Sequence, residues 1–247
     1  MRLLVDMGNS RVKWTWEEAG TLGPIQAFDR PHTEPETAFA RAWGALQPSA
    51  GTVCAVTGDA AVATLQHWAA ERWGLWLQRL CPAPRHGALV NAYRRPEQLG
   101  ADRWANLLGA RARLGAVDAV VADAGTAVTV DALGSDGVHR GGAILGGIAA
   151  ARAGLGGAAP ALTGALEAAD LPALDTGAAI GGGTLVGTAG ALERVGRAVA
   201  RDLYSPRLLL TGGDAERLRP WLEAEWTLDP LVTLRGLQSA GAQACAG

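Results

Sequence analysis

Two short segments share one pattern, and this repetition constrains the fold more than any other feature of the chain. In residues 3–14 and 120–131 an apolar run ends in an aspartate, a turn of small residues follows, and apolar and polar residues then alternate. The pattern predicts strand, tight turn and strand, with Asp6 or Asp123 at the tip of the first strand. Each copy opens one half of the chain, so we expect two α/β lobes facing one another across a cleft.

The turns of these segments are suited to binding an anion. Gly8 and Gly125 allow a sharp turn that brings backbone N–H groups within reach of a phosphate. Thr126 and Thr129 add hydroxyls near the second turn. A plain β-hairpin explains one copy equally well, but two copies facing a cleft favour a site for a nucleoside triphosphate and its metal.

Composition excludes several classes of protein. With 247 residues, 49% hydrophobic and 19% charged, the chain is globular and large enough for one or two domains. A net charge of −2 and a pI near 6.1 argue against sequence-independent nucleic-acid binding. The three cysteines lack the spacing of a zinc site or a disulfide framework, and no apolar stretch reaches the ~20 residues of a membrane span. We therefore expect a cytoplasmic protein that binds neither nucleic acid nor membrane.

Other segments have periodicities that predict further elements. Helices are expected at 36–46, 60–73, 99–116, 176–201 and 215–225, and further strands at 52–56, 137–147 and 207–211. The nine tryptophans are expected mainly in the core or in interfaces. No catalytic triad, zinc motif or Walker loop occurs, and the histidines form no cluster, so we expect them at the surface or in loops; they are His32, His67, His86 and His139.

Asp102 and Arg103 fall in the first turn of the helix expected at 99–116. An acid there complements the helix dipole and needs no catalytic role. The alternative is a general base, which the dipole and a neighbouring arginine keep ionised. Lys13 is the only lysine among 22 basic residues. Its position beside the first turn favours a functional role for that turn.

Together these motifs resemble the type III pantothenate kinase family of the acetate and sugar kinase/Hsp70/actin superfamily. The first hairpin is similar to the family's DxGNTxxK segment, residues 91–104 to its substrate loop and GxDR helix start, and the second hairpin to its DxGTAxTxD segment. Residues 176–183 and 211–215 are similar to its TxxAIxxG and TGGDA segments. The resemblance covers nearly the whole chain. It implies two actin-like, ribonuclease H-like lobes with mixed sheets flanked by helices, at 1–115 and 116–247.

The resemblance also implies roles for individual residues. ATP phosphates and Mg²⁺ would be bound by the first hairpin, Asp6, Met7, Gly8, Asn9, Ser10, Arg11, Val12 and Lys13, and Thr126 would contact ATP. Pantothenate would be held by Tyr93, Gly100, Ala101, Asp102, Arg103 and Thr176. Asp102 would be the catalytic base, and Asp123 would bind a monovalent cation, K⁺ or NH₄⁺. Family members are typically homodimers, so we expect one here.

One position departs from the family pattern. The run 141–147 has Gly146 where the family commonly has proline, which puts the shape of that turn in doubt. The expected activity is ATP-dependent phosphorylation of pantothenate, the first step of coenzyme A synthesis. Two alternatives stay open: a kinase or phosphatase acting on another small substrate, and a non-enzymatic regulator.

Overall fold

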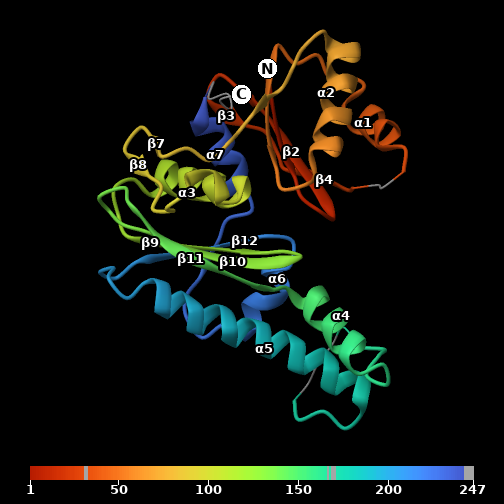
Figure 1. Ribbon diagram of the computed structural model, residues 1–247, viewed down its shortest axis with the longest axis vertical. Helices are drawn as coiled ribbons and strands as arrows, with labels where there is room; N and C mark the ends of the chain where they lie inside the picture. The colour runs from red at the N-terminus through yellow and green to blue at the C-terminus, as the bar shows by residue number, and fades with distance from the viewer. Residues whose placement is uncertain (31–32, 166, 168–170, 242–247) are drawn as a thin grey trace. The chain divides into compact units, whose positions relative to one another are not determined.

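Both acid-tipped segments form antiparallel hairpins in the computed structural model, which describes residues 1–30, 33–165, 167 and 171–241 (Figure 1). β1 (Arg2–Met7) pairs with β2 (Arg11–Glu18), and Asp6 lies opposite Lys13. β9 (Ala119–Ala124) pairs with β10 (Ala127–Leu133), and Asp123 lies opposite Thr129. The prediction of two strand–turn–strand segments is confirmed.

The chain divides into two units. Unit 1 comprises Met1–Gly115 together with the residues from Leu231 onward, and unit 2 comprises Ala116–Pro230. The sequence prediction placed residues 231–247 in the second lobe, whereas the structure places α7 (Val232–Ala240) in unit 1. An amphipathic pattern identifies the apolar face of such a helix but not the element that covers it.

The hairpin of unit 1 lies in a six-stranded sheet. The order is β3-β2-β1-β5-β6, with β4 also paired to β2. β5 runs parallel to β1, and the later strands are short. The bounds are β3 (Thr21–Leu22), β4 (Gln26–Asp29), β5 (Ala50–Ala55) and β6 (Gln78–Arg79). A separate pair, β7 (Arg85–His86) and β8 (Leu89–Val90), and the 3₁₀ helix η1 (Pro96–Gln98) precede the next helix.

An aromatic cluster forms the core between this sheet and two helices, α1 (Pro35–Trp43) and α2 (Asp59–Trp73). Trp43 is fully buried and stacks on Phe39, with ring centroids 5.2 Å apart. Trp68 contacts both rings. Most tryptophans therefore fill the core as predicted, although Trp76 is 65% exposed.

Two glycines let α7 approach α3 (Ala101–Leu114) closely. A Cβ atom on Gly109 would lie 1.9 Å from the carbonyl oxygen of Val232, and one on Gly236 would lie 1.9 Å from that of Ala105. Between the helices, the Thr233 hydroxyl donates a 2.7 Å hydrogen bond to Asn106 Oδ1 in a buried contact. The backbones of the two helices are thus in direct contact.

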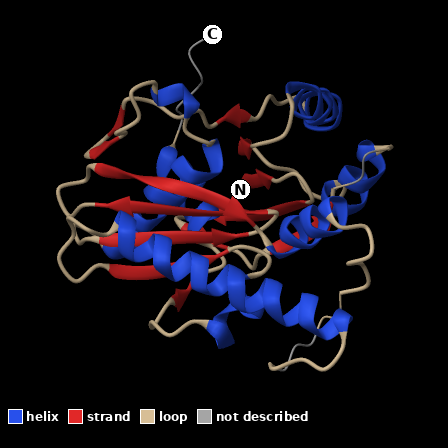
Figure 2. Ribbon diagram, turned by 60° about the horizontal axis from the view of Figure 1, so that its bottom comes forward, coloured by secondary structure: helices blue, strands red, loops and turns tan. Residues whose placement is uncertain are grey.

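Unit 2 contains a five-stranded sheet of order β11-β10-β9-β12-β13. Its long helix α5 (Thr176–Val199) runs along one face of the strands (Figure 2), and α6 (Ala215–Leu218) shares the same apolar core. The remaining elements are β11 (His139–Gly146), α4 (Ile148–Ala158), β12 (Arg207–Thr211), the 3₁₀ helix η2 (Arg219–Trp221) and β13 (Thr227–Leu228). The expected helix at 215–225 is shorter than predicted, and Pro220 lies in the 3₁₀ turn that follows it.

Two expectations about single residues were wrong. His139 is fully buried, and its Nε2 lies 2.9 Å from Asp131 Oδ1. The carboxylate on the neighbouring strand gives the ring nitrogen Nε2 a polar partner inside the fold, whereas the sequence alone places this histidine at the surface or in a loop. Cys81 is disulfide-bonded, which the scattered cysteine spacing did not predict. No helix in the described parts of the chain is long and apolar enough to cross a membrane.

Candidate active site

The tip of the first hairpin is closed by backbone hydrogen bonds. The Gly8 N–H donates to the Arg11 carbonyl at 3.0 Å, which makes the turn. Arg30, just after β4, donates from its backbone N–H to the Ser10 carbonyl and from Nε to the Asn9 carbonyl, both at 2.9 Å. Sequence reasoning missed Arg30, because only the pairing of β4 with β2 brings it to the turn.

Asp6 and Lys13 supply opposite charges at the base of this turn. They are direct cross-strand partners, so their side chains project from the same face of the sheet. Asp6 is only 8% exposed, whereas Lys13 is half-buried and Asn9 and Ser10 are exposed. A carboxylate that can accept hydrogen bonds from metal-bound water, next to an ammonium group and the backbone of a tight turn, suits a polyphosphate with its divalent ion.

Asn91 organises the loop that was predicted to bind substrate. Its Oδ1 accepts a 3.0 Å hydrogen bond from the Tyr93 N–H, and its Nδ2 donates to the Pro96 carbonyl at 3.2 Å. The first bond makes an Asx turn, and the second ties the same side chain to the end of the loop, so that the backbone at Tyr93 is held in place. Further along the loop, the hydrogen bond from Arg95 lowers the pKa of Glu97.

Arg103 connects this loop to α3. Its side chain is 3% exposed, and its Nη1 donates a 2.6 Å hydrogen bond to the Tyr93 hydroxyl. Its guanidinium carbon also lies 5.4 Å from the centre of the Tyr93 ring. A buried guanidinium of this kind is a suitable partner for a carboxylate on a small substrate.

Asp102 lies in the first turn of α3, as predicted. Its Oδ1 accepts a 2.7 Å hydrogen bond from the Arg103 N–H, one of the donors that a helix start leaves unsatisfied. Gly100 precedes the helix, and a Cβ atom there would lie 2.5 Å from this oxygen. The glycine therefore leaves room for the carboxylate, and Ala101 between them begins the helix.

The tip of the second hairpin is held by backbone hydrogen bonds from two glycines. The Gly125 N–H donates to the Ala127 carbonyl at 3.0 Å, and the Gly147 N–H donates to the Thr126 carbonyl at 3.1 Å. A Cβ atom on Gly147 would lie 2.0 Å from the Gly125 carbonyl oxygen. Gly147 is therefore in backbone contact with the turn. The Thr126 side chain is exposed.

Thr176 is the first residue of α5. The preceding residue, Asp175, caps the helix by accepting a 2.8 Å hydrogen bond at Oδ1 from the Ala178 N–H. Thr176 itself is exposed. Unit 2 thus carries two separate groups of predicted residues: Asp123 and Thr126 on the hairpin, and Thr176 at the helix start.

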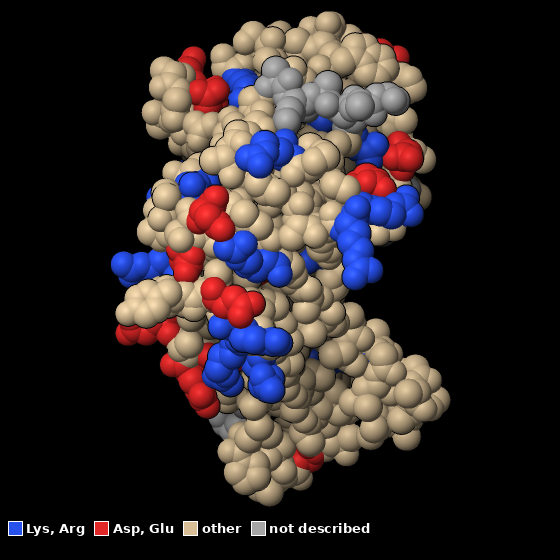
Figure 3. Space-filling view, turned by 60° about the vertical axis from the view of Figure 1, so that its left-hand side comes forward, with Lys and Arg blue, Asp and Glu red and all other residues tan. Residues whose placement is uncertain are grey.

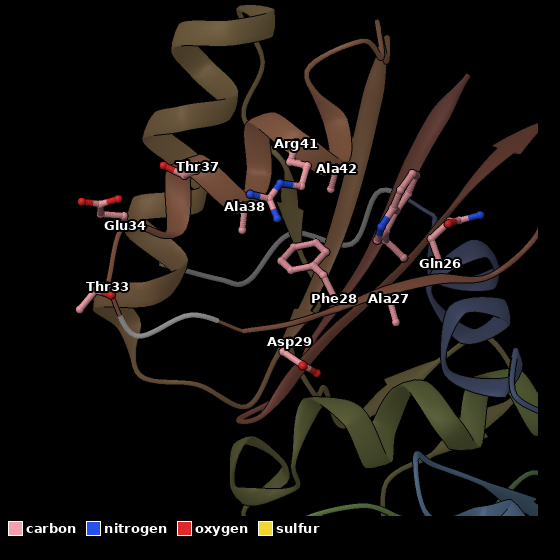
Figure 4. A pocket seen from close by; sticks show the side chains of 11 residues that line it. Gln26, Ala27, Phe28, Asp29, Thr33, Glu34, Thr37, Ala38, Arg41 and Ala42 are labelled. Atoms are coloured by element: carbon pink, nitrogen blue, oxygen red, sulfur yellow. The ribbon is translucent and has the colours of Figure 1, made fainter.

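A cavity of about 680 Å³ in unit 1 contains none of the predicted site residues (Figure 4). It lies between β4 and α1, with Trp14 and Phe28 among its apolar lining residues. Arg41, Glu34 and Asp29 add charged groups at its wall. The predicted chemistry lies instead on the hairpins, on the loop and at the start of α3.

Known proteins similar to this chain are found both by sequence and by structure. The sequence profile described as type III pantothenate kinase matches residues 2–198. A type III pantothenate kinase of Nitrosococcus oceani is 34% identical, covering 96% of this chain and 92% of its own length, and one of Alkalilimnicola ehrlichii is 36% identical, covering 95% of each. A solved structure from Campylobacter jejuni, described as a conserved putative Baf family transcriptional activator, superposes with a TM-score of 0.61 at 22% identity over 96% of each chain.

The two α/β units, each with an acid-tipped hairpin, have the fold class that the sequence predicted, and the solved structures that superpose on the chain share this fold. The chain belongs to the type III pantothenate kinase family.

Proposed function

We propose that the protein is a cytoplasmic, ATP-dependent pantothenate kinase, which forms 4'-phosphopantothenate in the first step of coenzyme A synthesis. The observation that carries this proposal is the start of α3, where Asp102 lies beside Arg103 and Arg103 contacts Tyr93 of the preceding loop. One carboxylate and one buried guanidinium on adjacent residues match a substrate that has a hydroxyl to activate and a carboxylate to hold.

Asp102 is the proposed catalytic base. The helix N-terminus and the Arg103 N–H favour its charged form. With the substrate hydroxyl within ~3 Å, the proton passes to a carboxylate oxygen of Asp102 and the hydroxyl oxygen bonds to the γ-phosphorus. The bond from that phosphorus to the bridging oxygen breaks, and ADP leaves.

Tyr93, Arg103 and Thr176 are the proposed pantothenate ligands, with Gly100 and Ala101 shaping the helix start. Arg103 would bind the substrate carboxylate, and its hydrogen bond to Tyr93 would orient it. The Thr176 hydroxyl is exposed at the first turn of α5 and can donate to or accept from the polar groups of pantothenate.

The two hairpins are the proposed ATP ligands. Residues from Asp6 to Lys13 would bind the phosphates, Thr126 would contact ATP, and Asp6 would hold Mg²⁺ through the phosphates. Bound Mg²⁺ neutralises charge on the transferred group. Asp123 would bind a monovalent cation, K⁺ or NH₄⁺, at the end of β9.

A homodimer is also proposed, and α4 supports it. Ile148 is the one buried residue of this helix, and its exposed positions carry only alanine and glycine; they are Ala149, Ala150, Ala153, Gly154, Gly157 and Ala158. Figure 3 shows the lower end of unit 2, where α4 lies in Figure 1, with few charged side chains. An uncharged helix face of small residues allows two helices to pack closely. Sedimentation of the wild type and of Ala153→Glu tests this, and an unchanged dimer in the variant would exclude α4 as the interface.

The experiment that tests the function is coupled ADP release with ATP–Mg²⁺ and pantothenate, first in potassium and then in sodium buffer. Asp102→Asn should lower turnover by about 10²–10⁴. Asp202→Asn, an exposed surface acid, is the matched control and should leave turnover unchanged.

The alternatives predict other outcomes. ADP release that ignores pantothenate would favour a kinase of another small hydroxylated substrate. No turnover by protein with a native circular dichroism spectrum would favour a non-enzymatic regulator. The resemblance to the Campylobacter structure shows the fold alone at 22% identity and gives the regulator no independent support.

A further inference from the structure

Three polar side chains form a row across the sheet of unit 2. Thr129 of β10 and Thr211 of β12 are the cross-strand partners of Asp123 in β9, one on either side of it. The neighbouring positions along each of these strands face the other way and pack into the core with α5; they include Val120, Ala122, Val128, Val130 and Leu210. Because side chains alternate between faces, the row lies on the face opposite α5. One carboxylate is therefore flanked by two hydroxyls.

The hydroxyl of Thr211 is the unusual member of this row. The side chain is 0% exposed, and within the described parts of the chain its Oγ1 has no hydrogen-bond partner. An unsatisfied buried hydroxyl destabilises the folded state, and valine would have nearly the same shape without that cost. Such an oxygen is available to a ligand that the chain does not itself provide, and its position beside Asp123 distinguishes it from other buried hydroxyls.

Thr211 and Asp123 are held at a fixed separation. They lie at or next to the carboxyl ends of two parallel strands, the edge at which open α/β sheets bind ligands. Gly212 follows with φ of 105°, and a Cβ atom there would lie 2.1 Å from the Ala124 carbonyl oxygen. The Asp214 N–H donates to the same oxygen at 2.8 Å. Adjacent strands lie about 4.8 Å apart, a spacing that one bound ion between the two side chains can bridge.

We propose that the Thr211 hydroxyl oxygen is a direct ligand of the monovalent cation at Asp123. The inference takes one premise from the proposed function, namely that Asp123 binds a monovalent cation. It does not depend on which substrate accepts the phosphate. Hard cations prefer oxygen ligands, and one carboxylate joined by neutral hydroxyls gives a weakly charged site. Among the described residues no group of three or more acidic, histidine or cysteine side chains could hold a metal. Such a site suits K⁺ or NH₄⁺ better than a divalent ion.

The test measures cation binding through stability rather than turnover. Thermal unfolding midpoints of the intact protein with ADP–Mg²⁺, and without pantothenate, are recorded against KCl, with choline chloride keeping the ionic strength constant. The variants are Thr211→Val, which removes the hydroxyl at constant shape, and Thr211→Ser, which retains it. Thr57→Val is the matched control, because Thr57 in unit 1 also has a buried hydroxyl without a partner among the described residues.

Thr211→Val should raise the half-saturating K⁺ concentration at least about tenfold, in line with the loss of an interaction at a metal site. Its midpoint in choline chloride should equal or exceed that of the wild type. Thr211→Ser and Thr57→Val should keep the wild-type K⁺ response. A full K⁺ response in Thr211→Val, or no K⁺-specific response in the wild type, would overturn the proposal. If Thr211→Val does not fold, a wild-type response in Thr211→Ala would overturn it equally.

Discussion

The Arg103 guanidinium donates a 2.6 Å hydrogen bond to the Tyr93 hydroxyl and lies 5.4 Å from the centre of the same ring. The first contact depends on the hydroxyl and the second on the ring, so the tyrosine restrains the arginine in two ways. Because Arg103 is buried on α3 and Tyr93 lies on the preceding loop, this pair fixes the loop against the helix that carries Asp102.

Tyr93→Phe should weaken pantothenate binding more than it slows the chemical step. The phenyl ring stays, but a buried charged donor loses one acceptor, a change worth about 1.5–3 kcal/mol. We expect KM for pantothenate to rise about tenfold or more with a smaller change in kcat, measured by coupled ADP release. Arg103→Lys should be more severe, because an ammonium group cannot reproduce the planar fork. Equal KM values for the wild type and Tyr93→Phe would show that the contact does not orient Arg103 for substrate.

Gly147→Ala should disrupt the second hairpin turn, whereas Gly146→Ala should be tolerated. The new Cβ at Gly147 would lie 2.0 Å from the Gly125 carbonyl oxygen, whereas at Gly146 the nearest atom is 3.8 Å away. We expect Gly147→Ala to cost about 1–3 kcal/mol in unfolding free energy and to weaken ATP binding. Urea denaturation and nucleotide titration measure both effects, and similar values for the two variants would contradict the turn geometry.

Gly236→Ala should destabilise unit 1, because its Cβ would lie 1.9 Å from the Ala105 carbonyl oxygen of α3. Backbone cannot give way as a side chain can, so we expect a loss of at least about 2 kcal/mol. Gly190→Ala on α5 is the control: nothing lies within 4 Å of that site, and alanine is favoured over glycine in a helix by about 1 kcal/mol. Thermal unfolding should shift in opposite directions for the two variants.

Asp118 should make stability depend on pH. Its carboxylate accepts hydrogen bonds from the backbone N–H groups of Tyr204 and Ser135, which lower its pKa below the usual 3.8. A lowered pKa in the folded state gives stability that is present above the unfolded pKa and is lost as pH falls through the folded value. Asp118→Asn should therefore cost about 1 kcal/mol at pH 7, since solvent screens the site, and progressively less below pH ~4. A constant difference between pH 7 and pH 3 would contradict this.

The local sequence pattern was sufficient to predict the two hairpins and the first turn of α3. Alternation of side chains and a glycine turn are short-range signals, so Asp6, Asp123 and Asp102 could be placed at their strand or helix ends. The motif resemblance then assigned roles that no short-range pattern could supply.

Residues that depend on tertiary pairing could not be found in this way. Arg30 reaches the first turn only because β4 pairs with β2, and β4 is four residues long without strong alternation. His139 is buried because Asp131 lies on the next strand. Thr211 looks like an ordinary strand end until its burial and register with Asp123 are known.

The position of α7 has a consequence for how the protein is made. Most of unit 1 precedes unit 2 in the chain, yet its helix α7 follows unit 2 and is therefore synthesised after it. While the ribosome translates unit 2, the face of α3 around Gly109 and Ala105 has no covering helix, and unit 1 is incomplete. Unit 2, at Ala116–Pro230, is continuous and can fold first. Completion of unit 1 therefore waits until α7 has been translated, and a transcript truncated before Val232 would yield a polypeptide for chaperones and proteases rather than a partial kinase.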